Sequence, residues 1–231
     1  MSMRVLGIVP AREGSKGIPR KNERPLAGRT LIERASEAAI ASGVVDRLVL
    51  STDSERIAEL GRRAGLEVPF LRPPQLATDE AAMQPVVEHA LGVVEAGGWR
   101  PDIVVLLQPT APLRTGAHVR AAVELLLESG ASAVASVVAV PSHLSPHYVM
   151  RLDGTRLVPF LPEGAFVARR QDVEPAFYRD GTVYAVRRQV LVEQHDLYGS
   201  DCRALVLDPR ESIMLDEPED WERAEELLGR R

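Results

Sequence analysis

The chain has 231 residues, of which 45% are apolar, so it can bury one substantial core, and we expect a single domain spanning residues 1–231. Its net charge of −5 argues against a general nucleic-acid-binding protein and against a protein that binds anionic membranes. The single cysteine, Cys202, excludes an internal disulfide and cannot by itself make a zinc site, and we expect it to be buried or inactive. We also expect a cytoplasmic protein, because no segment approaches the roughly 20 apolar residues of a membrane span and the opening apolar run is too short for a secretory signal.

Predicted strands and helices alternate along the first 140 residues. "RVLGIVP" (4–10) is a nearly continuous apolar run typical of a strand buried on both faces, and "RTLIERASEAAIAS" (29–42) has helical spacing with a capping box of Thr30 and Glu33. The next predicted strands are 47–53, 67–70, 102–108 and 132–140, and the next predicted helices are 54–65, 83–98 and 116–129. This alternation predicts an α/β fold with a mostly parallel sheet, which binds ligands beyond the carboxyl ends of its strands.

The pattern changes at about residues 141–190, where prolines are frequent and Asp153-Gly154 indicates a hairpin turn. We interpret this segment as a small inserted lobe. A strand at 204–208 and a helix at 217–231 then complete the domain.

The loop "VPAREGSKGIPRKN" (9–22), which leaves the first predicted strand, concentrates glycines and basic side chains. It matches neither the common phosphate-loop pattern nor the dinucleotide pattern of spaced glycines. Gly14 and Gly17 let the backbone approach a ligand closely, and four side chains would contact phosphate oxygens. These side chains are Arg12, Ser15, Lys16 and Lys21. A solvated basic turn is the alternative, but the position after the first strand favours binding.

Three further loops carry polar side chains near strand ends. Asp53 would either bind a ribose or metal or, as we favour, cap the next helix. Arg72 lies in a proline-rich turn that would either contact a nucleotide or remain on the surface. In "LLQPTAPLR" (106–114) two prolines stiffen the loop after the most apolar strand, which favours a binding loop that presents Gln108 and Arg114.

Two later segments would complete a site for an acidic ligand and a metal. "RRQDVEPAFYRDGTVYAV" (169–186) combines Arg170 and Tyr184 with an Asp-Gly turn at 180–181, and forms either an anion site or only the hairpin of the lobe. The acidic segment before the last helix contains Asp216, which would either bind a divalent cation or favour the start of that helix.

Six of these segments together resemble the acylneuraminate cytidylyltransferase family, the CMP-sialic acid synthetases. In family order they are "VPAREGSKGIPRKN", "LSTD", "LRPPQLATDE", "LQPTAPLR", "RRQDVEPAFYRDGTVYAV" and "LDEPEDW", and they cover nearly the whole chain. The resemblance implies a three-layer α/β nucleotidyltransferase fold and a homodimer joined through the inserted lobe. It also implies Mg²⁺-dependent transfer of CMP from CTP to a sugar acid, with a sialic-acid-like nonulosonate as first candidate, and release of pyrophosphate.

The same resemblance implies roles for individual residues. The catalytic residues would be Arg12, Lys21 and Gln108. Nucleotide contacts would come from Arg12, Ser15, Lys16, Lys21, Asn22 and Arg72, acceptor contacts from Gln108, Arg114, Arg170 and Tyr184, and the Mg²⁺ contact from Asp216. These roles agree with displacement at an α-phosphate, which needs cations and a metal to stabilise the transferring group and the departing pyrophosphate.

Two positions depart from the family pattern. The family has two carboxylates separated by one apolar residue before the last helix, whereas this chain has Met214, Leu215 and Asp216. A thioether is a poor ligand for Mg²⁺, so the metal would rely on Asp216, phosphate oxygens and water, with Asp208 as a further candidate. His147 stands near a position where family members often have lysine, which indicates an unusual acceptor.

Three alternatives to a cytidylyltransferase with a sialic-acid-like acceptor stay open. In the first, the enzyme transfers CMP to a phosphonate or another small acid, since an oxyanion can make the same in-line attack. The missing carboxylate at position 214 motivates a non-catalytic nucleotide-binding or regulatory protein. An NAD-dependent oxidoreductase is the weakest reading, because the glycine fingerprint is absent.

Overall fold

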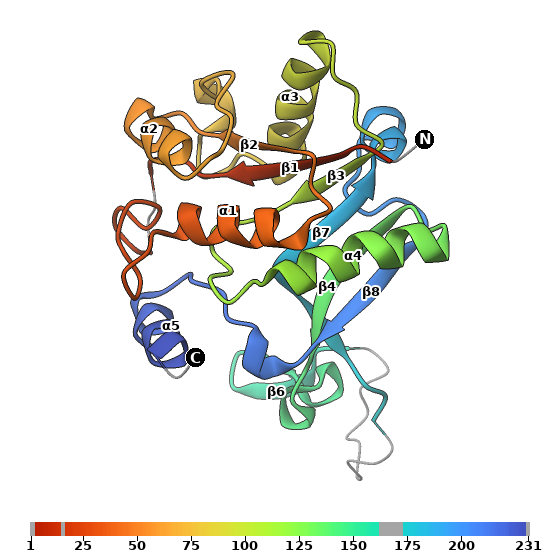
Figure 1. Ribbon diagram of the computed structural model, residues 1–231. Coiled ribbons are helices and arrows are strands. Elements are labelled where there is room, and N and C mark those ends of the chain that lie inside the picture. Colours follow the sequence, from red (N-terminus) through yellow and green to blue (C-terminus); the bar gives the residue numbers. More distant parts are fainter. Residues whose placement is uncertain (1–2, 15–16, 162–172, 230–231) are drawn as a thin grey trace.

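The computed structural model of the protein describes residues 3–14, 17–161 and 173–229, and within them it has a central six-stranded sheet (Figure 1). In spatial order the strands are β2 (Arg47–Ser51), β1 (Val5–Pro10), β3 (Ile103–Leu106), β7 (Phe177–Arg187), β4 (Ala133–Ala139) and β8 (Cys202–Leu207). β1 pairs in parallel with β2 and β3, and β4 pairs in parallel with β8, whereas β7 runs antiparallel between β3 and β4. The predicted mostly parallel sheet is confirmed.

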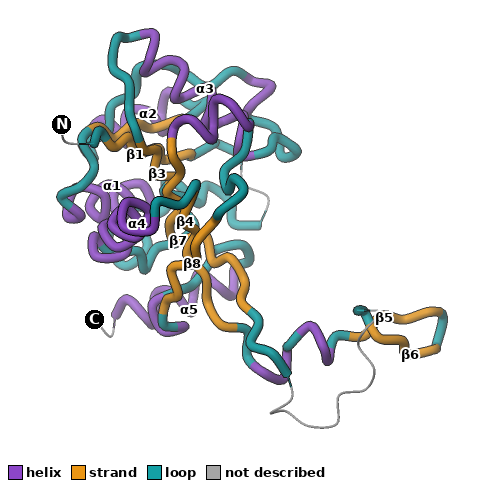
Figure 2. The backbone as a smooth tube through the Cα atoms, turned by 90° about the vertical axis from the view of Figure 1, so that its right-hand side faces the viewer, coloured by secondary structure: helices purple, strands orange, loops and turns teal. Residues whose placement is uncertain are grey.

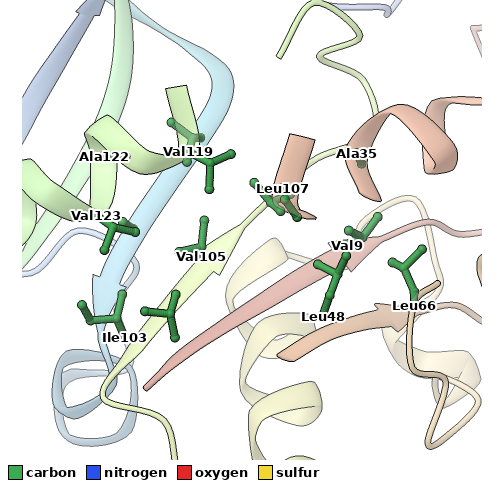
Figure 3. Close-up of a cluster of buried hydrophobic side chains, with 14 of the residues drawn as sticks. Val9, Ala35, Leu48, Leu66, Ile103, Val105, Leu107, Val119, Ala122 and Val123 are labelled. Atoms are coloured by element: carbon green, nitrogen blue, oxygen red, sulfur yellow. The ribbon is translucent and has the colours of Figure 1, made fainter. Parts of the chain in front are cut away.

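Helices cover both faces of this sheet and make three layers. On one face lie α1 (Leu31–Ser42) and α4 (Gly116–Ser129), and on the other lies α3 (Met83–Ala96). Figure 3 shows part of the first interface, in which Ala35 of α1 and Val119 of α4 belong to one buried cluster with Val9 of β1. The predicted three-layer arrangement is therefore confirmed.

Two further α-helices lie in the described ranges. α2 (Glu55–Arg63) follows β2 and buries Ile57 in the cluster beneath α1. α5 (Pro218–Gly229) buries Trp221 in a smaller cluster with Leu31 and Leu215, so it holds the end of the chain against the start of α1. No helix in the described ranges is long and apolar enough to cross a membrane.

The predicted capping box fixes the start of α1. The Glu33 amide donates to Thr30 Oγ1 at 3.2 Å, and the Thr30 amide donates to Glu33 Oε2 at 2.6 Å. A cap of this kind contributes about 1 kcal/mol. Gly43, with φ of 66°, ends the helix in the left-handed conformation that glycine adopts without a steric penalty.

Three expectations differ from the structure. Residues 67–70 form no strand, and only an isolated bridge joins Glu67 to Val49, because Pro69 cannot donate to a ladder. Cys202 is exposed on the edge strand β8, which contradicts burial and leaves the expectation that it is inactive untested. The inserted lobe was expected to reach residue 190, but β7 pairs with β3 and β4 in the central sheet, so that boundary is too late.

The predicted hairpin at Asp153-Gly154 is present. β5 (Met150–Asp153) and β6 (Arg156–Pro159) pair antiparallel, and Gly154 has a φ of 62°. Figure 2 shows this hairpin projecting away from the body of the molecule. Short helical turns connect other elements at Pro74–Leu76, Ser142–Leu144, Pro146–Tyr148, Val190–Gln194 and Pro209–Glu211.

Candidate active site

A cavity of about 280 Å³ lies at the carboxyl ends of β1 and β3, where the fold predicts ligand binding. Three segments that are distant in sequence meet there: the opening loop, the loop after β3 and the segment before α5. The structure brings six predicted site residues to its walls, namely Arg12, Lys21, Asn22, Arg72, Gln108 and Asp216.

Main-chain contacts join the opening loop to the segment before α5. A Cβ at Gly17 would lie 2.0 Å from the Asp216 carbonyl oxygen, so only glycine allows this approach. Lys21 Nζ donates to the Leu215 carbonyl at 2.7 Å, and the Leu215 amide donates to the Thr110 carbonyl at 2.9 Å. All three predicted segments therefore form one connected wall.

The cations at this cavity are partly or fully removed from water. Burial lowers the pKa of Lys21, and the nearby Arg12 lowers it further, whereas Asp216 and Asp220 act in the opposite direction. Arg72 is only 5% exposed; burial lowers its pKa to about 10, and its guanidinium donates to Ser51. A protein with an overall negative charge thus concentrates positive charge where an anionic ligand would enter.

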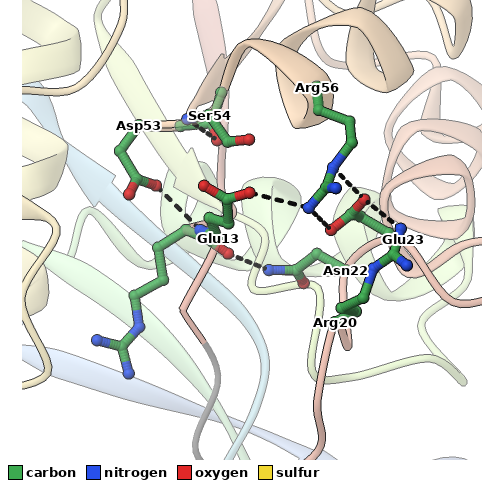
Figure 4. Close-up of polar contacts among 9 residues, drawn as sticks. Glu13, Arg20, Asn22, Glu23, Asp53, Ser54 and Arg56 are labelled. Carbon is green, nitrogen blue, oxygen red and sulfur yellow. Dashed lines mark hydrogen bonds and ion pairs between the residues drawn. The ribbon is translucent and has the colours of Figure 1, made fainter.

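Side chains of Asn22 and Asp53 hold the opening loop through hydrogen bonds to its main chain (Figure 4). Asn22 Nδ2 donates to the Arg12 carbonyl at 2.9 Å, and the Glu13 amide donates to Asp53 Oδ1 at 3.0 Å. Ser54, and not Asp53, is the N-cap residue of α2, and its side chain makes no capping bond. The role favoured for Asp53 is therefore wrong, because this carboxylate anchors the opening loop.

Side chains alternate along the segment before α5, as the sequence predicts. Ile213 and Leu215 are buried in the cluster beneath α5, whereas Met214 and Asp216 line the cavity. Thr110 Oγ1 lies 4.0 Å from the Met214 sulfur. Position 214, where the family pattern has a carboxylate, thus faces the site.

The residues present suit a metal site with a single carboxylate. Among the described residues no group of three or more His, Cys, Asp or Glu side chains could hold a metal ion. Asp220 Oδ2 already accepts from the Asp216 and Glu217 amides at 3.0 and 2.8 Å, and Asp208 accepts from the Arg210 amide. Asp216 is exposed to the cavity, and Mg²⁺ commonly binds one or two carboxylates together with substrate phosphates and water. Asp216 therefore fits this ion.

A second cavity, of about 440 Å³, adjoins the first. Met214 and Asp216 line both cavities, so these two side chains form the shared wall. Tyr178 from β7 and Arg223 from α5 also line the second cavity, and neither was predicted from the sequence. The sequence offered one signal for Arg223. Residues 220 and 223 are three positions apart, so they share a face of the last predicted helix, and both line this cavity.

Two predicted acceptor residues line neither cavity. Arg114 is buried and donates to the carbonyl oxygens of Gln108 and Thr182; burial lowers its pKa to about 9. Tyr184 lies in the core cluster beside α3, and burial raises its pKa to about 12. The geometry thus gives Arg114 a role in holding the Gln108 backbone, and it does not favour direct contact of either side chain with an acceptor. Ser15, Lys16 and Arg170 lie outside the described residues.

The Asp-Gly pair at 180–181 is a bulge inside β7 and not the predicted turn. The register between β4 and β7 shifts between Ala135 and Val137, and Gly181 has a φ of 71°. A Cβ at Gly181 would lie 2.8 Å from the Met214 sulfur and 3.0 Å from Gln108 Oε1. The bulge therefore brings the strand against two side chains that line the first cavity.

Comparisons with known proteins agree with this geometry. A family model described as cytidylyltransferase matches residues 6–199. The chain is 34% identical over 229 residues to the CMP-N,N'-diacetyllegionaminic acid synthase of Legionella pneumophila, covering 98% of this chain and 97% of that protein. It is 30% identical over 221 residues to an N-acylneuraminate cytidylyltransferase of Streptococcus agalactiae, covering 95% of this chain and 52% of that protein. The solved structure of CMP:2-keto-3-deoxy-manno-octonic acid synthetase complexed with CTP has the same fold, with a TM-score of 0.74 at 18% identity over 98% of this chain and 99% of that one.

Proposed function

Because this chain belongs to the cytidylyltransferase family, we propose that it transfers CMP from CTP to a sialic-acid-like nonulosonate and releases pyrophosphate. The observation that carries the proposal is the meeting of Arg12, Lys21 and Arg72 with Asp216 in one cavity. A triphosphate is the anion that such a set of cations suits best. The oxidoreductase alternative is excluded by the family match.

The first cavity is assigned to CTP. Arg12 and Lys21 would bind the triphosphate and stabilise the charge that develops on the departing pyrophosphate, so we regard them as catalytic. Arg72 and Asn22 would lie near the nucleoside. Gln108 lines the same cavity from the loop after β3, where its amide would orient the reacting groups.

The second cavity is assigned to the acceptor, because it meets the first at Met214 and Asp216. Arg223 lines it and would receive the carboxylate of an acidic acceptor, while Tyr178 offers an aromatic ring and a hydroxyl. A hydroxyl of the acceptor would attack the α-phosphorus and lose its proton to solvent, forming one phosphorus–oxygen bond while the bond to pyrophosphate breaks. Residues between the two cavities would hold the reacting atoms in line.

We further propose that Asp216 binds Mg²⁺. This ion, when bound, would supply positive charge to the phosphate oxygens. The carboxylate of Asp216 supports the assignment, because it is exposed to the cavity assigned to CTP, whose phosphate oxygens would be further ligands.

A homodimer through the inserted lobe is also proposed. Leu152, Leu157 and Phe160, on and beside the projecting hairpin, are between 59% and 71% exposed. Large apolar side chains gathered on one exposed element are typical of an interface. This proposal agrees with the dimer that the family resemblance implies, and it would cover these apolar side chains with a second copy of the chain.

The function is tested by measuring pyrophosphate release in a screen that combines the four nucleoside triphosphates with sugar acids and phosphonates. We expect release with CTP and a nonulosonate in the presence of Mg²⁺, and a rate at least roughly a hundredfold lower in Arg12→Ala. Release only with a phosphonate or another acid would favour that acceptor class. Binding of CTP without release for any acid and any divalent metal would favour a nucleotide-binding protein without this activity.

A further inference from the structure

Arg56 in α2 contacts residues on both sides of the glycines of the opening loop, although it lines neither cavity (Figure 4). Its Nη2 lies 2.9 Å from Glu13 Oε1, before the glycines of the loop. The same guanidinium contacts Glu23, after the glycines, with Nε 2.6 Å from Oε2 and Nη2 2.9 Å from Oε1. One side chain from another element therefore joins the two segments that flank the glycines of the loop.

Glu23 connects Arg56 to residues of the nucleotide cavity. Its side chain is only 7% exposed and also receives Arg20, at 3.2 Å. Asn22 precedes it and donates to the Arg12 carbonyl, and Lys21 lies one residue earlier in the same turn. A displacement of Glu23 would thus move residues that line the cavity.

Charge gives this contact a second effect. Glu13 and Glu23 place two carboxylates beside a loop assigned to a triphosphate, and unpaired carboxylates there would repel that ligand. Arg56 offsets part of this charge. Its side chain is 53% exposed, so the ion pairs contribute little to global stability, and their effect would appear in the loop.

We propose that Arg56 is a positioning residue for CTP: it holds together the two segments that flank the glycines of the opening loop and offsets part of the charge of Glu13 and Glu23, without touching the nucleotide. The proposal rests on the assignment of CTP to the first cavity. It predicts that losing Arg56 weakens CTP binding more than it slows the chemical step.

The test compares Arg56→Ala with Arg62→Ala in the full-length chain. Arg62 lies on the same helix and pairs with Glu55 and Glu59, but among the described residues none of its ion pairs reaches the loop, so it is the matched control. We expect calorimetry to show CTP binding about tenfold weaker in Arg56→Ala and unchanged in Arg62→Ala. At saturating CTP, kcat should stay within about twofold of the wild-type value.

A conservative variant and a measurement without nucleotide complete the test. Arg56→Lys keeps one positive charge, so it should restore part of the lost CTP affinity, although it cannot reproduce both contacts with Glu23. Hydrogen exchange of amides in residues 11–24 should be faster in Arg56→Ala than in Arg62→Ala, with the two unfolding temperatures alike.

Wild-type CTP affinity together with wild-type exchange in Arg56→Ala would overturn the proposal. An equal loss of affinity in Arg62→Ala would also overturn it, because the effect would then not depend on contact with the loop. If the wild-type protein bound no CTP, the proposed function would fail, whereas the exchange measurement would still decide whether Arg56 holds the loop.

Discussion

Lys21 holds its positive charge at a partly buried position, and burial lowers its pKa below the ordinary value of 10.5. The protonated form is therefore the one that folding disfavours, and the proton leaves the folded protein at a lower pH than it leaves a free lysine. A triphosphate needs the protonated form. The rate should thus fall on the alkaline side earlier than an unperturbed lysine would allow.

Lys21→Arg should move this alkaline limit to higher pH, because arginine keeps its proton throughout the accessible range. The absolute rate should be lower, since the longer guanidinium cannot occupy the same place against the Leu215 carbonyl. The measurement is the pH profile of kcat/KM for CTP, which reports groups of the free enzyme. An alkaline limit that does not move in Lys21→Arg would show that another group sets it.

Asp216 and Met214 lead to a prediction about the metal. Asp216→Asn should lower activity by roughly a hundredfold or more, because it removes the proposed carboxylate ligand. Met214→Asp should lower the Mg²⁺ concentration needed for half-maximal rate, because side chains 214 and 216 line the same cavity. The measurement is the Mg²⁺ dependence of pyrophosphate release.

Met214→Leu is the matched control, since it replaces the thioether with an apolar side chain of similar size and should leave the Mg²⁺ dependence unchanged. Thermal unfolding separates a metal effect from a packing effect. If Met214→Asp only lowered the unfolding temperature, position 214 would act in packing, because a buried unpaired carboxylate is costly. Full activity of Asp216→Asn at low Mg²⁺ would exclude Asp216 from the site.

At the scale of single elements, the two Asp-Gly pairs show where local sequence predicts structure and where it does not. An Asp-Gly pair is a strong signal for a hairpin turn, and the prediction was correct at 153–154. At 180–181 the same pair forms a bulge, because the flanking residues pair with β3 and β4, which precede them by many residues. Such pairing cannot be read from the dipeptide.

Gly181 and Gly154 allow a matched test of the bulge. Both have positive φ, at 71° and 62°, so alanine would cost each about 1–2 kcal/mol in backbone strain. Only at Gly181 would the new methyl group meet Met214 and Gln108, since nothing lies within 4 Å of a Cβ at Gly154. Gly181→Ala should therefore lower kcat/KM by roughly tenfold to a hundredfold, whereas Gly154→Ala should leave it unchanged. Equal activity of the two variants would mean that the bulge does not position the site.

At the scale of the molecule, the layers and most residues that line the first cavity could be predicted from the sequence. The burial of Arg114 could not. Arg12, Lys21, Gln108 and Asp216 were found because they follow or face strand ends, which meet at one edge of an α/β sheet. Arg114 lies in the same loop as Gln108, yet its side chain turns inward. Burial of that kind depends on β7, whose place in the sheet is set by contacts distant in sequence.

The projecting hairpin leads to a prediction for the assembly. Leu152→Lys and Leu157→Lys should convert the proposed dimer to a monomer, because a charge at an apolar interface would be desolvated without a partner. Both side chains are exposed, at 71% and 59%, so the substituted monomer should keep its fold. Ile40→Lys is the control, since Ile40 is 65% exposed on α1, outside the hairpin. Sedimentation velocity distinguishes the two states, and a dimer that survives both hairpin variants would place the interface elsewhere.

The wall between the two cavities has a consequence for how this protein can diverge. Residues 214–216 are held through main-chain atoms: Lys21 binds the Leu215 carbonyl, the Leu215 amide binds Thr110, and Gly17 lies against the Asp216 carbonyl. None of these contacts depends on which side chain stands at position 214. Mutation there can change a side chain that lines both cavities while the backbone stays in place. Position 214 is therefore an evolvable point of this scaffold, and saturation mutagenesis aimed at new acceptors would sensibly begin there.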